Sequence, residues 1–273
     1  MFRAFPFGYV GVRLFVILTA SLDGPGKPDS EGVAVAGLVS TETRLRRFSK
    51  QWGRLLTKYR LPFFHAAQCM ARKGPYRKWR DKWDERLLSF VRVANLAILY
   101  PVGVSIPTET YNKLPRWDRE RSGNQYFFAA WGCFHEATRW LRTSRPDRDK
   151  VAYVYDWGDE GRGEVSKVGN FIHDDIDLRA MHRIVSMEFQ SKEMFTPIQA
   201  ADLIAWAVRD EVLRRLGVSR PPRPTPLLSL RMPLLLYPTP DQLRDIAARF
   251  ASANIRQGRG WKANPLNARR RTL

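Results

Sequence analysis

The chain has 273 residues, 44% of them hydrophobic and 12% aromatic, a composition that can bury a full core and excludes a disordered or fibrous protein. Lys and Arg number 46 against 27 Asp and Glu, and the net charge of +19 is typical of a protein with a polyanionic partner, most often nucleic acid. The alternative is that the positive charge only keeps the protein surface soluble. Cys69 and Cys133 are far apart, which favours neither a disulfide framework nor a zinc site and fits a reducing cytoplasm.

The apolar stretch over 12–22 is interpreted as a buried strand and not as a signal peptide, because Arg13 interrupts it and no small-residue cleavage site follows. No apolar run approaches the length of a membrane span. We therefore expect no membrane partner and a cytoplasmic location.

Strands and helices alternate through the middle of the chain, which is typical of an α/β fold with a mixed sheet flanked by helices. Strands are predicted where β-branched and apolar residues run together, over 12–22, 32–39, 95–106, 151–156 and 183–189. Helices are predicted over 43–59 (with Thr41 as N-cap), 79–94, 123–141, 164–178 and 195–211. Between the first two helices we expect an extended piece over 61–65 and a basic loop over 66–78.

Composition changes beyond Leu216, so the sequence predicts one α/β domain over 10–216 and a proline-rich, basic C-terminal arm over 217–273. A capping-box pattern, Thr239 to Gln242, predicts one short helix within the arm. Residues 214–273 contain thirteen Arg and Lys but only two Asp. This segment either contacts phosphates or forms a solvated surface.

Within the stretch 195–211, the helix is predicted to start at Pro197, whose fixed φ suits a first helical turn. The residues that follow are apolar or small, so the helix should be packed on most sides. Asp202 lies in the middle of this run. A buried carboxylate needs a metal, a cation or hydrogen-bond donors, or it stays protonated, and a structural hydrogen bond to nearby backbone is the simplest of these outcomes.

Two further carboxylates follow predicted strands, Asp23 after the first and Asp156 after the fourth. Ligand sites in α/β sheets lie at the carboxyl ends of strands, so Asp23, Asp156 and Asp202 are predicted to converge there, with carboxyl groups roughly 4–8 Å apart. Their repulsion would be relieved by Mg²⁺ or Mn²⁺, which prefers oxygen ligands and would support phosphodiester hydrolysis. Removing one charge should then leave the metal-free protein as stable or more so. Each Asp alone could equally be structural.

His65 precedes the basic loop and is a candidate proton shuttle or metal neighbour, or else a partly buried structural histidine. Lys192 is a candidate phosphate contact, with an exposed lysine as the alternative. The candidate nucleic-acid contacts in the basic loop are Arg72, Lys73 and Arg77.

Four segments together resemble the domain of unknown function 3800 family over about 14–211: a strand ending in Asp-Gly, a Phe-His segment before a Gly-Pro loop, VYDWGDEG, and SK…PIQAADLIAW. The most specific match is the run from Gln199 to Leu203, since the family typically has Leu-Gln-x-Ala-Asp-Leu on a helix. The resemblance implies a ribonuclease H-like fold, a link to mobile elements and phage defence, and a metal-dependent nuclease activity. Asp23, Asp156 and Asp202 match its acidic positions.

The chain departs from the family pattern in two places. The first strand is followed by Asp23-Gly24-Pro25-Gly26 where the family usually has Asp-Glu-Ser-Gly, and Gln68-Cys69 stands where relatives often carry an acid. Because the three acidic positions are nevertheless present, we expect a Mg²⁺- or Mn²⁺-dependent nuclease. The alternative is a non-catalytic nucleic-acid-binding or assembly protein of a mobile element or phage-defence system that keeps the fold.

Overall fold

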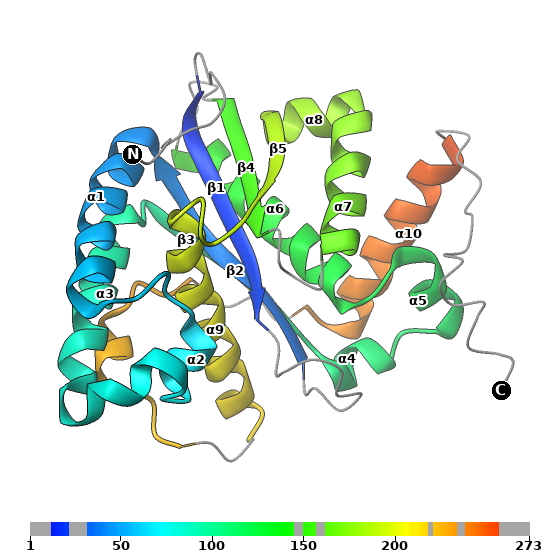
Figure 1. The fold of residues 1–273 in the computed structure, drawn as a ribbon. Helices are drawn as coiled ribbons and strands as arrows, with labels where there is room; N and C mark the ends of the chain where they lie inside the picture. Colours follow the sequence, from blue (N-terminus) through cyan, green and yellow to red (C-terminus); the bar gives the residue numbers. More distant parts are fainter. Residues whose placement is uncertain are drawn as a thin grey trace, which may run out of the picture.

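A computed structural model describes residues 12–21, 32–144, 150–156, 162–217, 221–233 and 238–256. Its five strands are β1 Val12–Ser21, β2 Gly32–Thr41, β3 Tyr100–Pro107, β4 Lys150–Asp156 and β5 Ile184–Gln190. They form one sheet in the order β3-β2-β1-β4-β5 (Figure 1). β2 is antiparallel to both β1 and β3, whereas β1, β4 and β5 run parallel to one another. The predicted mixed sheet flanked by helices is confirmed.

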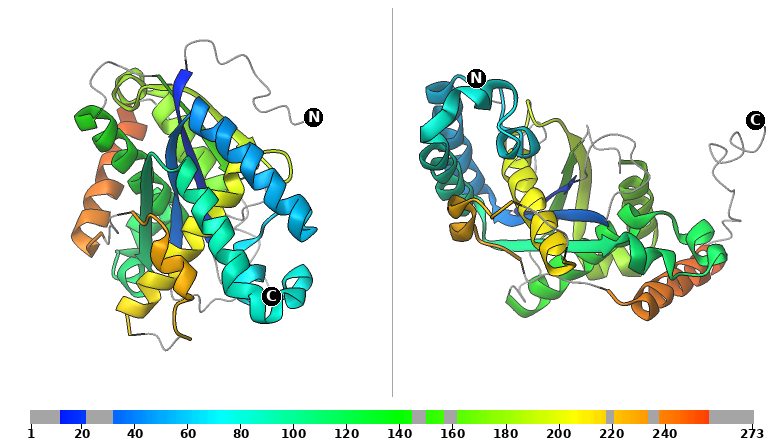
Figure 2. Two further views of the ribbon diagram at one scale, coloured as in Figure 1. Left: turned by 90° about the vertical axis from the view of Figure 1, so that its left-hand side faces the viewer. Right: turned by 90° about the horizontal axis from the view of Figure 1, so that it is seen from below.

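Helices cover both faces of the sheet (Figure 2). One face carries α1 Glu42–Tyr59, α2 Ala66–Met70, η1 Gly74–Lys82, α3 Trp83–Ala97, α9 Pro197–Arg215 and η2 Thr225–Ser229. The other carries α4 Thr108–Asn112, α5 Arg116–Ser122, α6 Gln125–Ser144, α7 Arg162–Asp174, α8 Ile176–His182 and α10 Pro240–Arg256. None of the helices described is both long and apolar enough to cross a membrane.

The sheet separates two apolar cores because side chains alternate between its faces. On β4, Ala152 and Val154 pack with the α1, α3 and α9 layer, whereas Tyr153 and Tyr155 pack with α6. Helix α9 crosses β1 and β2 and is buried along almost its whole length, with Ala200 and Ala201 fully buried. The prediction of a helix packed on most sides, starting at Pro197, is confirmed.

Several element boundaries differ from the sequence-based prediction. The expected loop over 66–78 contains α2 and most of η1, and 61–65 is not a strand. α3 continues to Ala97, which is fully buried, so the third strand starts only at Tyr100. The helix expected over 164–178 divides at Asp175, whose Oδ1 accepts hydrogen bonds from Asp177 N and Leu178 N, both 3.0 Å, and so caps α8.

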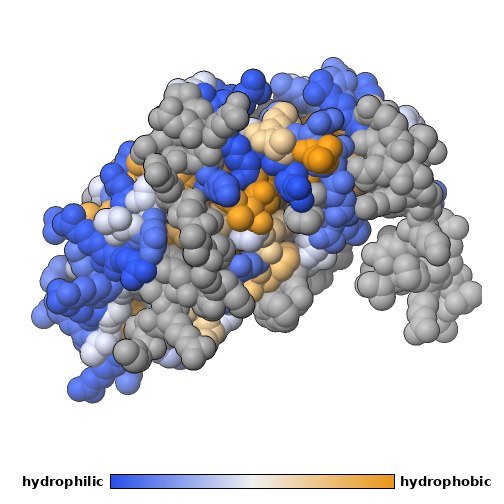
Figure 3. All heavy atoms as spheres, turned by 90° about the horizontal axis from the view of Figure 1, so that it is seen from above, coloured by the Kyte–Doolittle hydropathy of each residue, from blue (hydrophilic) through white to orange (hydrophobic). Residues whose placement is uncertain are grey.

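A groove of about 830 Å³ lies at the amino ends of β4 and β5, the upper end of the sheet in Figure 1. Four of its lining side chains are basic and none is acidic: Arg142, Lys150, Arg179 and Arg183. Seen from above, apolar surface lies between hydrophilic residues on this side of the molecule (Figure 3). Since β4 has seven residues, the groove is roughly 20 Å from the carboxyl end of that strand.

The described parts of the C-terminal region pack onto the domain, so an independent arm over 217–273 is not confirmed. Leu227 and Leu230 are buried in the core that contains α3 and α9. Leu243 and Phe250 of α10 are buried in the opposite core. The predicted capping box is present, because Thr239 N donates to the Gln242 side chain and Gln242 N donates to Thr239 Oγ1.

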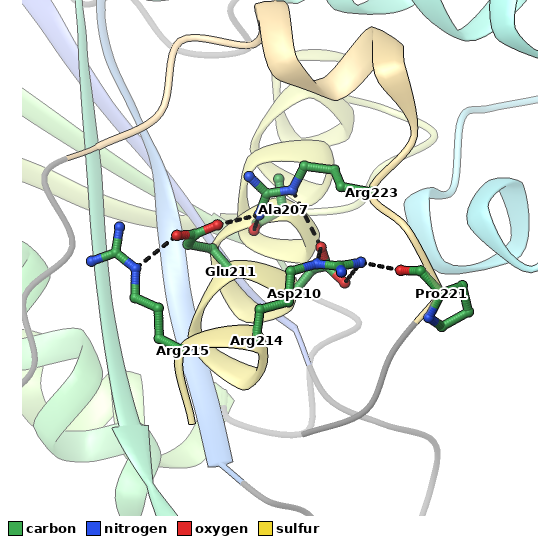
Figure 4. A network of polar contacts seen from close by, with 7 residues as sticks. All are labelled: Ala207, Asp210, Glu211, Arg214, Arg215, Pro221 and Arg223. Atoms are coloured by element: carbon green, nitrogen blue, oxygen red, sulfur yellow. Dashed lines mark hydrogen bonds and ion pairs between the residues drawn. The ribbon is translucent and has the colours of Figure 1, made fainter. Parts of the chain in front are cut away.

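A network of ion pairs fastens this region to the end of α9 (Figure 4). Arg223 Nε lies 3.3 Å from Asp210 Oδ2, and its Nη2 lies 2.9 Å from Glu211 Oε2 and donates to Ala207 O. Arg214 Nε lies 2.9 Å from the same Asp210 oxygen, and Arg214 also donates to the Pro221 carbonyl. Asp210 is only 2% exposed. These arginines therefore hold the chain together and do not form an open phosphate-binding surface.

Replacing Arg223 by Ala is expected to lower the free energy of unfolding by about 2–4 kcal/mol. This is somewhat below the cost of leaving a buried charge alone, because Arg214 still pairs with Asp210. Chemical denaturation measures the change. Arg244→Ala is the matched control, because Arg244 pairs with the 85% exposed Asp241 and should contribute less than about 1 kcal/mol. Equal losses in the two variants would mean that the network does not fasten the segment.

Candidate functional site: two carboxylates around Lys192

Asp156 and Asp202 come together around a single lysine. Lys192 Nζ lies 3.1 Å from Asp156 Oδ2 and 3.3 Å from Asp202 Oδ1. Because one ammonium lies this close to both, the two oxygens are within about twice that distance of each other, as the sequence predicted for these two residues. Asp23, the third predicted member, lies outside the described residues, two positions beyond the end of β1.

The local sequence explains why these carboxylates face each other. Asp156 ends β4 and follows the alternation of Ala152 and Val154, so it points to the face that α9 covers. Asp202 lies in the second turn of α9, and both carboxylates are buried, with 3% and 5% of the residue exposed. A buried pair of this kind requires a cation or hydrogen-bond donors, and Lys192 supplies the cation.

Gln199 connects the segments that form the site, and sequence reasoning missed this role. Its Oε1 accepts hydrogen bonds from Trp52 Nε1 at 2.7 Å and from Phe64 N at 2.8 Å. Its Nε2 donates to Lys192 O at 2.6 Å. One amide side chain thus fixes α1, the segment before His65 and the turn before α9. A fully buried Gln in an apolar helix was the available signal, since such a group must find partners.

The backbone around His65 also contacts Asp202. Asp202 Oδ2 accepts a 2.8 Å hydrogen bond from Ala66 N, and His65 Nδ1 lies 3.4 Å from the same oxygen. That second distance is too long for a good hydrogen bond, so His65 is a neighbour that would need a small movement to bond. His65 N donates to Tyr76 Oη at 2.8 Å, which ties the segment to η1. The side chain of His65 is about one-third exposed, at 32%.

Electrostatics favour the charged forms of Asp202 and Lys192. Burial alone would raise the pKa of Asp202, but the Lys192 ammonium, His65 and the Ala66 N–H outweigh it and the pKa is lowered. Burial alone would lower the pKa of Lys192, but Asp202 and Asp156 outweigh it and the pKa is raised. Lys192 and Asp202 therefore form an ion pair at neutral pH.

The predicted nucleic-acid contacts divide into two groups. Arg72, Lys73 and Arg77 are exposed on the segment of α2 and η1, next to the Tyr76 that contacts the His65 backbone. Arg72 lies over the Trp83 ring, 4.9 Å from its centroid. Lys192 differs from the prediction of a lysine open to phosphate, since its side chain is only 18% exposed and is paired with both carboxylates.

Gln68 and Cys69, which stand where the resemblance predicts an acid, differ in their surroundings. Gln68 is exposed, whereas Cys69 is fully buried in the apolar core. Cys69 is therefore a core residue. Burial raises the pKa of its thiol, and a protonated thiol is a poor nucleophile or metal ligand. Neither residue adds a carboxylate to the site.

The ligand atoms in the site are of the type that a divalent cation prefers, but the described residues supply only two carboxylates. Asp156 and Asp202 offer hard carboxylate oxygens directed at one position, which is the chemistry that Mg²⁺ and Mn²⁺ prefer. Over the residues that the structure describes, no three His, Cys, Asp or Glu side chains form a group able to hold a metal. The cation that the described carboxylates share is the ammonium of Lys192.

Comparison of the chain with protein-family models, with curated proteins and with solved structures found no match in any of the three.

Proposed function

We propose that the chain is a Mg²⁺- or Mn²⁺-dependent nuclease that hydrolyses phosphodiester bonds. The observation that carries this proposal is the convergence of two buried carboxylates, from the end of β4 and from α9, on a single cation position. One oxygen of Asp202 accepts a backbone hydrogen bond from Ala66 N, but its other oxygen and Asp156 face each other at the carboxyl end of a strand, where ligand sites of α/β sheets lie.

We also propose that the fold is ribonuclease H-like. The five-stranded sheet, with an antiparallel half and a parallel half, supports this because a mixed sheet flanked by helices is what the resemblance implies. The position of the carboxylates supports it further, since the resemblance to the domain of unknown function 3800 family predicts acids at these places. Asp23 is the third acid of the proposal.

In the proposed mechanism Asp156 and Asp202, with Asp23, would hold the divalent cation. When bound, such ions activate water and stabilise the leaving oxygen of a phosphodiester. His65, partly exposed beside Asp202, would accept or return a proton at its imidazole. Arg72, Lys73 and Arg77 would hold the phosphate backbone of the substrate next to the site.

A second function is a non-catalytic nucleic-acid-binding protein, and one observation favours it. Lys192 already lies between the two carboxylates and offsets one of their two negative charges, so the pair is held together without a metal. In that case the carboxylates would serve the fold and the basic surface alone would serve nucleic acid.

The two functions are separated by a cleavage assay with the purified chain. Labelled single- and double-stranded DNA and RNA are incubated with Mg²⁺, with Mn²⁺ and with EDTA. We expect cleavage of at least one substrate with metal and none with EDTA. Binding of all four substrates with no cleavage under any metal condition would overturn the nuclease and leave the binding protein.

The basic loop gives a further prediction. Replacing Arg72, Lys73 and Arg77 together by Gln should weaken nucleic-acid binding for all sequences. It should also reduce the slope of log K against log salt by about two to three, roughly 0.9 for each phosphate that the chain no longer neutralises. Filter binding at several salt concentrations measures the slope.

The control for the loop variant removes the same charge at the groove, by replacing Arg142, Lys150 and Arg179 by Gln. These side chains lie at the amino end of the sheet, far from the carboxylates. The control should keep the wild-type slope if nucleic acid lies across the carboxylate end. Equal slopes for the loop variant and the wild type would remove the loop from the proposal.

A further inference from the structure

We propose that Lys192 is a displaceable internal cation: it holds the two carboxylates in the metal-free protein, and a divalent cation that binds there forces its ammonium out toward the substrate phosphate. This inference rests on the proposed function and adds to it how the site is loaded. It assigns Lys192 a role that neither an exposed phosphate-binding lysine nor a structural ion pair would have.

The Lys192 ammonium and a divalent cation would compete for the same carboxylate oxygens. The ammonium lies within 3.3 Å of Asp156 Oδ2 and Asp202 Oδ1, the same two atoms that a shared metal would use. The other oxygen of Asp202 is taken by the Ala66 N–H at 2.8 Å. A divalent ion bonded to both carboxylates would lie next to the ammonium, where repulsion in a partly buried site is large. The two cations therefore cannot occupy the site together.

The Lys192 side chain can leave while the backbone stays. Lys192 lies in the turn between β5 and α9, and Gln199 Nε2 bonds its carbonyl at 2.6 Å. The turn is open to solvent beyond it, since Met194 is 72% exposed. A lysine has four flexible methylenes, so rotation about its side-chain bonds moves the ammonium several ångströms without unfolding the turn.

Once outside the carboxylate pair, the ammonium remains tethered at the rim of the site, where a phosphodiester held on the metal would present its negative oxygens. The metal ion would replace the ammonium as the cation between the carboxylates. The phosphate would pair with the displaced ammonium. Binding of metal and of nucleic acid should therefore be mutually favourable, and linkage requires the effect to be reciprocal.

The test measures binding of Mn²⁺ alone to the full chain, by calorimetry or by the paramagnetic resonance of free Mn²⁺. Lys192→Met removes the competing ammonium and should tighten Mn²⁺ binding by about 10–100-fold, a part of what an adjacent positive charge would cost the ion. Lys150→Met is the control, because it removes the same charge at the opposite end of β4 and should leave the affinity unchanged.

A second measurement uses the unaltered protein, so the inference stays testable if Lys192→Met fails to fold. An amine-reactive reagent followed by mass spectrometry reports how exposed Lys192 is, with Lys113 as the exposed reference lysine. The yield at Lys192 should rise several-fold when Mn²⁺ is added, while that at Lys113 stays constant.

The outcomes separate this inference from the proposed function. Mn²⁺ binding of equal affinity in the wild type and Lys192→Met, or metal binding with no change in Lys192 labelling, would overturn displacement and leave a metal-binding site. No Mn²⁺ binding to either protein at millimolar concentrations would overturn both, and would assign Lys192 to a permanent ion pair.

Discussion

Asp202→Asn is expected to reduce cleavage by about 10²–10³-fold, the usual effect of removing one key electrostatic group from an active site. The substitution keeps the shape of the side chain and its hydrogen bond from Ala66 N, but removes the charge that faces Lys192. Cleavage rates of the folded variant and the wild type, compared at saturating Mg²⁺, measure the loss.

The same variant should be less stable without metal, which differs from the expectation that removing one carboxylate only relieves repulsion. Lys192 lies against both carboxylates and offsets one of their two negative charges, so the variant loses part of a buried ion pair and should lose about 1–3 kcal/mol. The pKa of Asp202 is lowered in the folded protein. Its contribution is therefore present above the unfolded pKa near 3.9, and the difference between the proteins should vanish as pH falls through the folded pKa.

Asp210→Asn is the matched control, because Asp210 is an equally buried acid on the same helix that pairs with Arg214 and Arg223. It should also destabilise the protein but keep cleavage per folded molecule. Full cleavage by Asp202→Asn would contradict a catalytic role for Asp202. A comparable loss of cleavage in both variants would mean that the effect is one of stability.

Gln199→Ala is expected to lower the free energy of unfolding by about 3–5 kcal/mol, more than Asp202→Asn. The substitution leaves two buried donors, Trp52 Nε1 and Phe64 N, and the part-buried Lys192 O without their partner, and each unsatisfied buried group costs about 1–3 kcal/mol. Denaturant titration monitored by tryptophan fluorescence measures the change, since Trp52 is itself one of the partners.

Two further variants show which of these hydrogen bonds matter. Gln199→Glu keeps the acceptor for Trp52 and Phe64 but loses the donor to Lys192 O, so the position of Lys192 should be affected more than that of the His65 segment. Gln125→Ala is the control, since this half-buried Gln on α6 donates to Ile106 O and Thr108 Oγ1 and has no third hydrogen bond within the described residues. A loss for Gln199→Ala no larger than for Gln125→Ala would contradict the central role of Gln199.

Elements that are marked by a local pattern of apolar residues could be predicted from the sequence. The β-branched runs gave the strands, and the apolar helix starting at Pro197 placed Asp202 in the interior. The position of Asp156 at a strand end, together with the rule for α/β sheets, predicted that it would meet Asp202. Both predictions use only local pattern and general topology.

Pairings between distant segments were not predictable. Lys192 was interpreted as a phosphate contact or an exposed lysine, because nothing in its own neighbourhood shows that the turn folds over Asp156. The C-terminal region read as an arm because its prolines and arginines are typical of a loop. Its few leucines and its ion pairs with α9 decide that it packs. Such pairings depend on the tertiary fold and not on periodicity.

The packing of residues 221–233 and 238–256 onto the two faces of the sheet has a consequence for synthesis on the ribosome. Leu227 completes one core and Leu243 the other, and each is made after all five strands. The central strand β1 pairs with β4, which is synthesised well over a hundred residues later. The nascent chain therefore exposes apolar strand and helix surface until late in translation, which is when aggregation and chaperone binding occur. A stop codon shortly after α9 would release a chain whose two hydrophobic layers both lack their last covering segment.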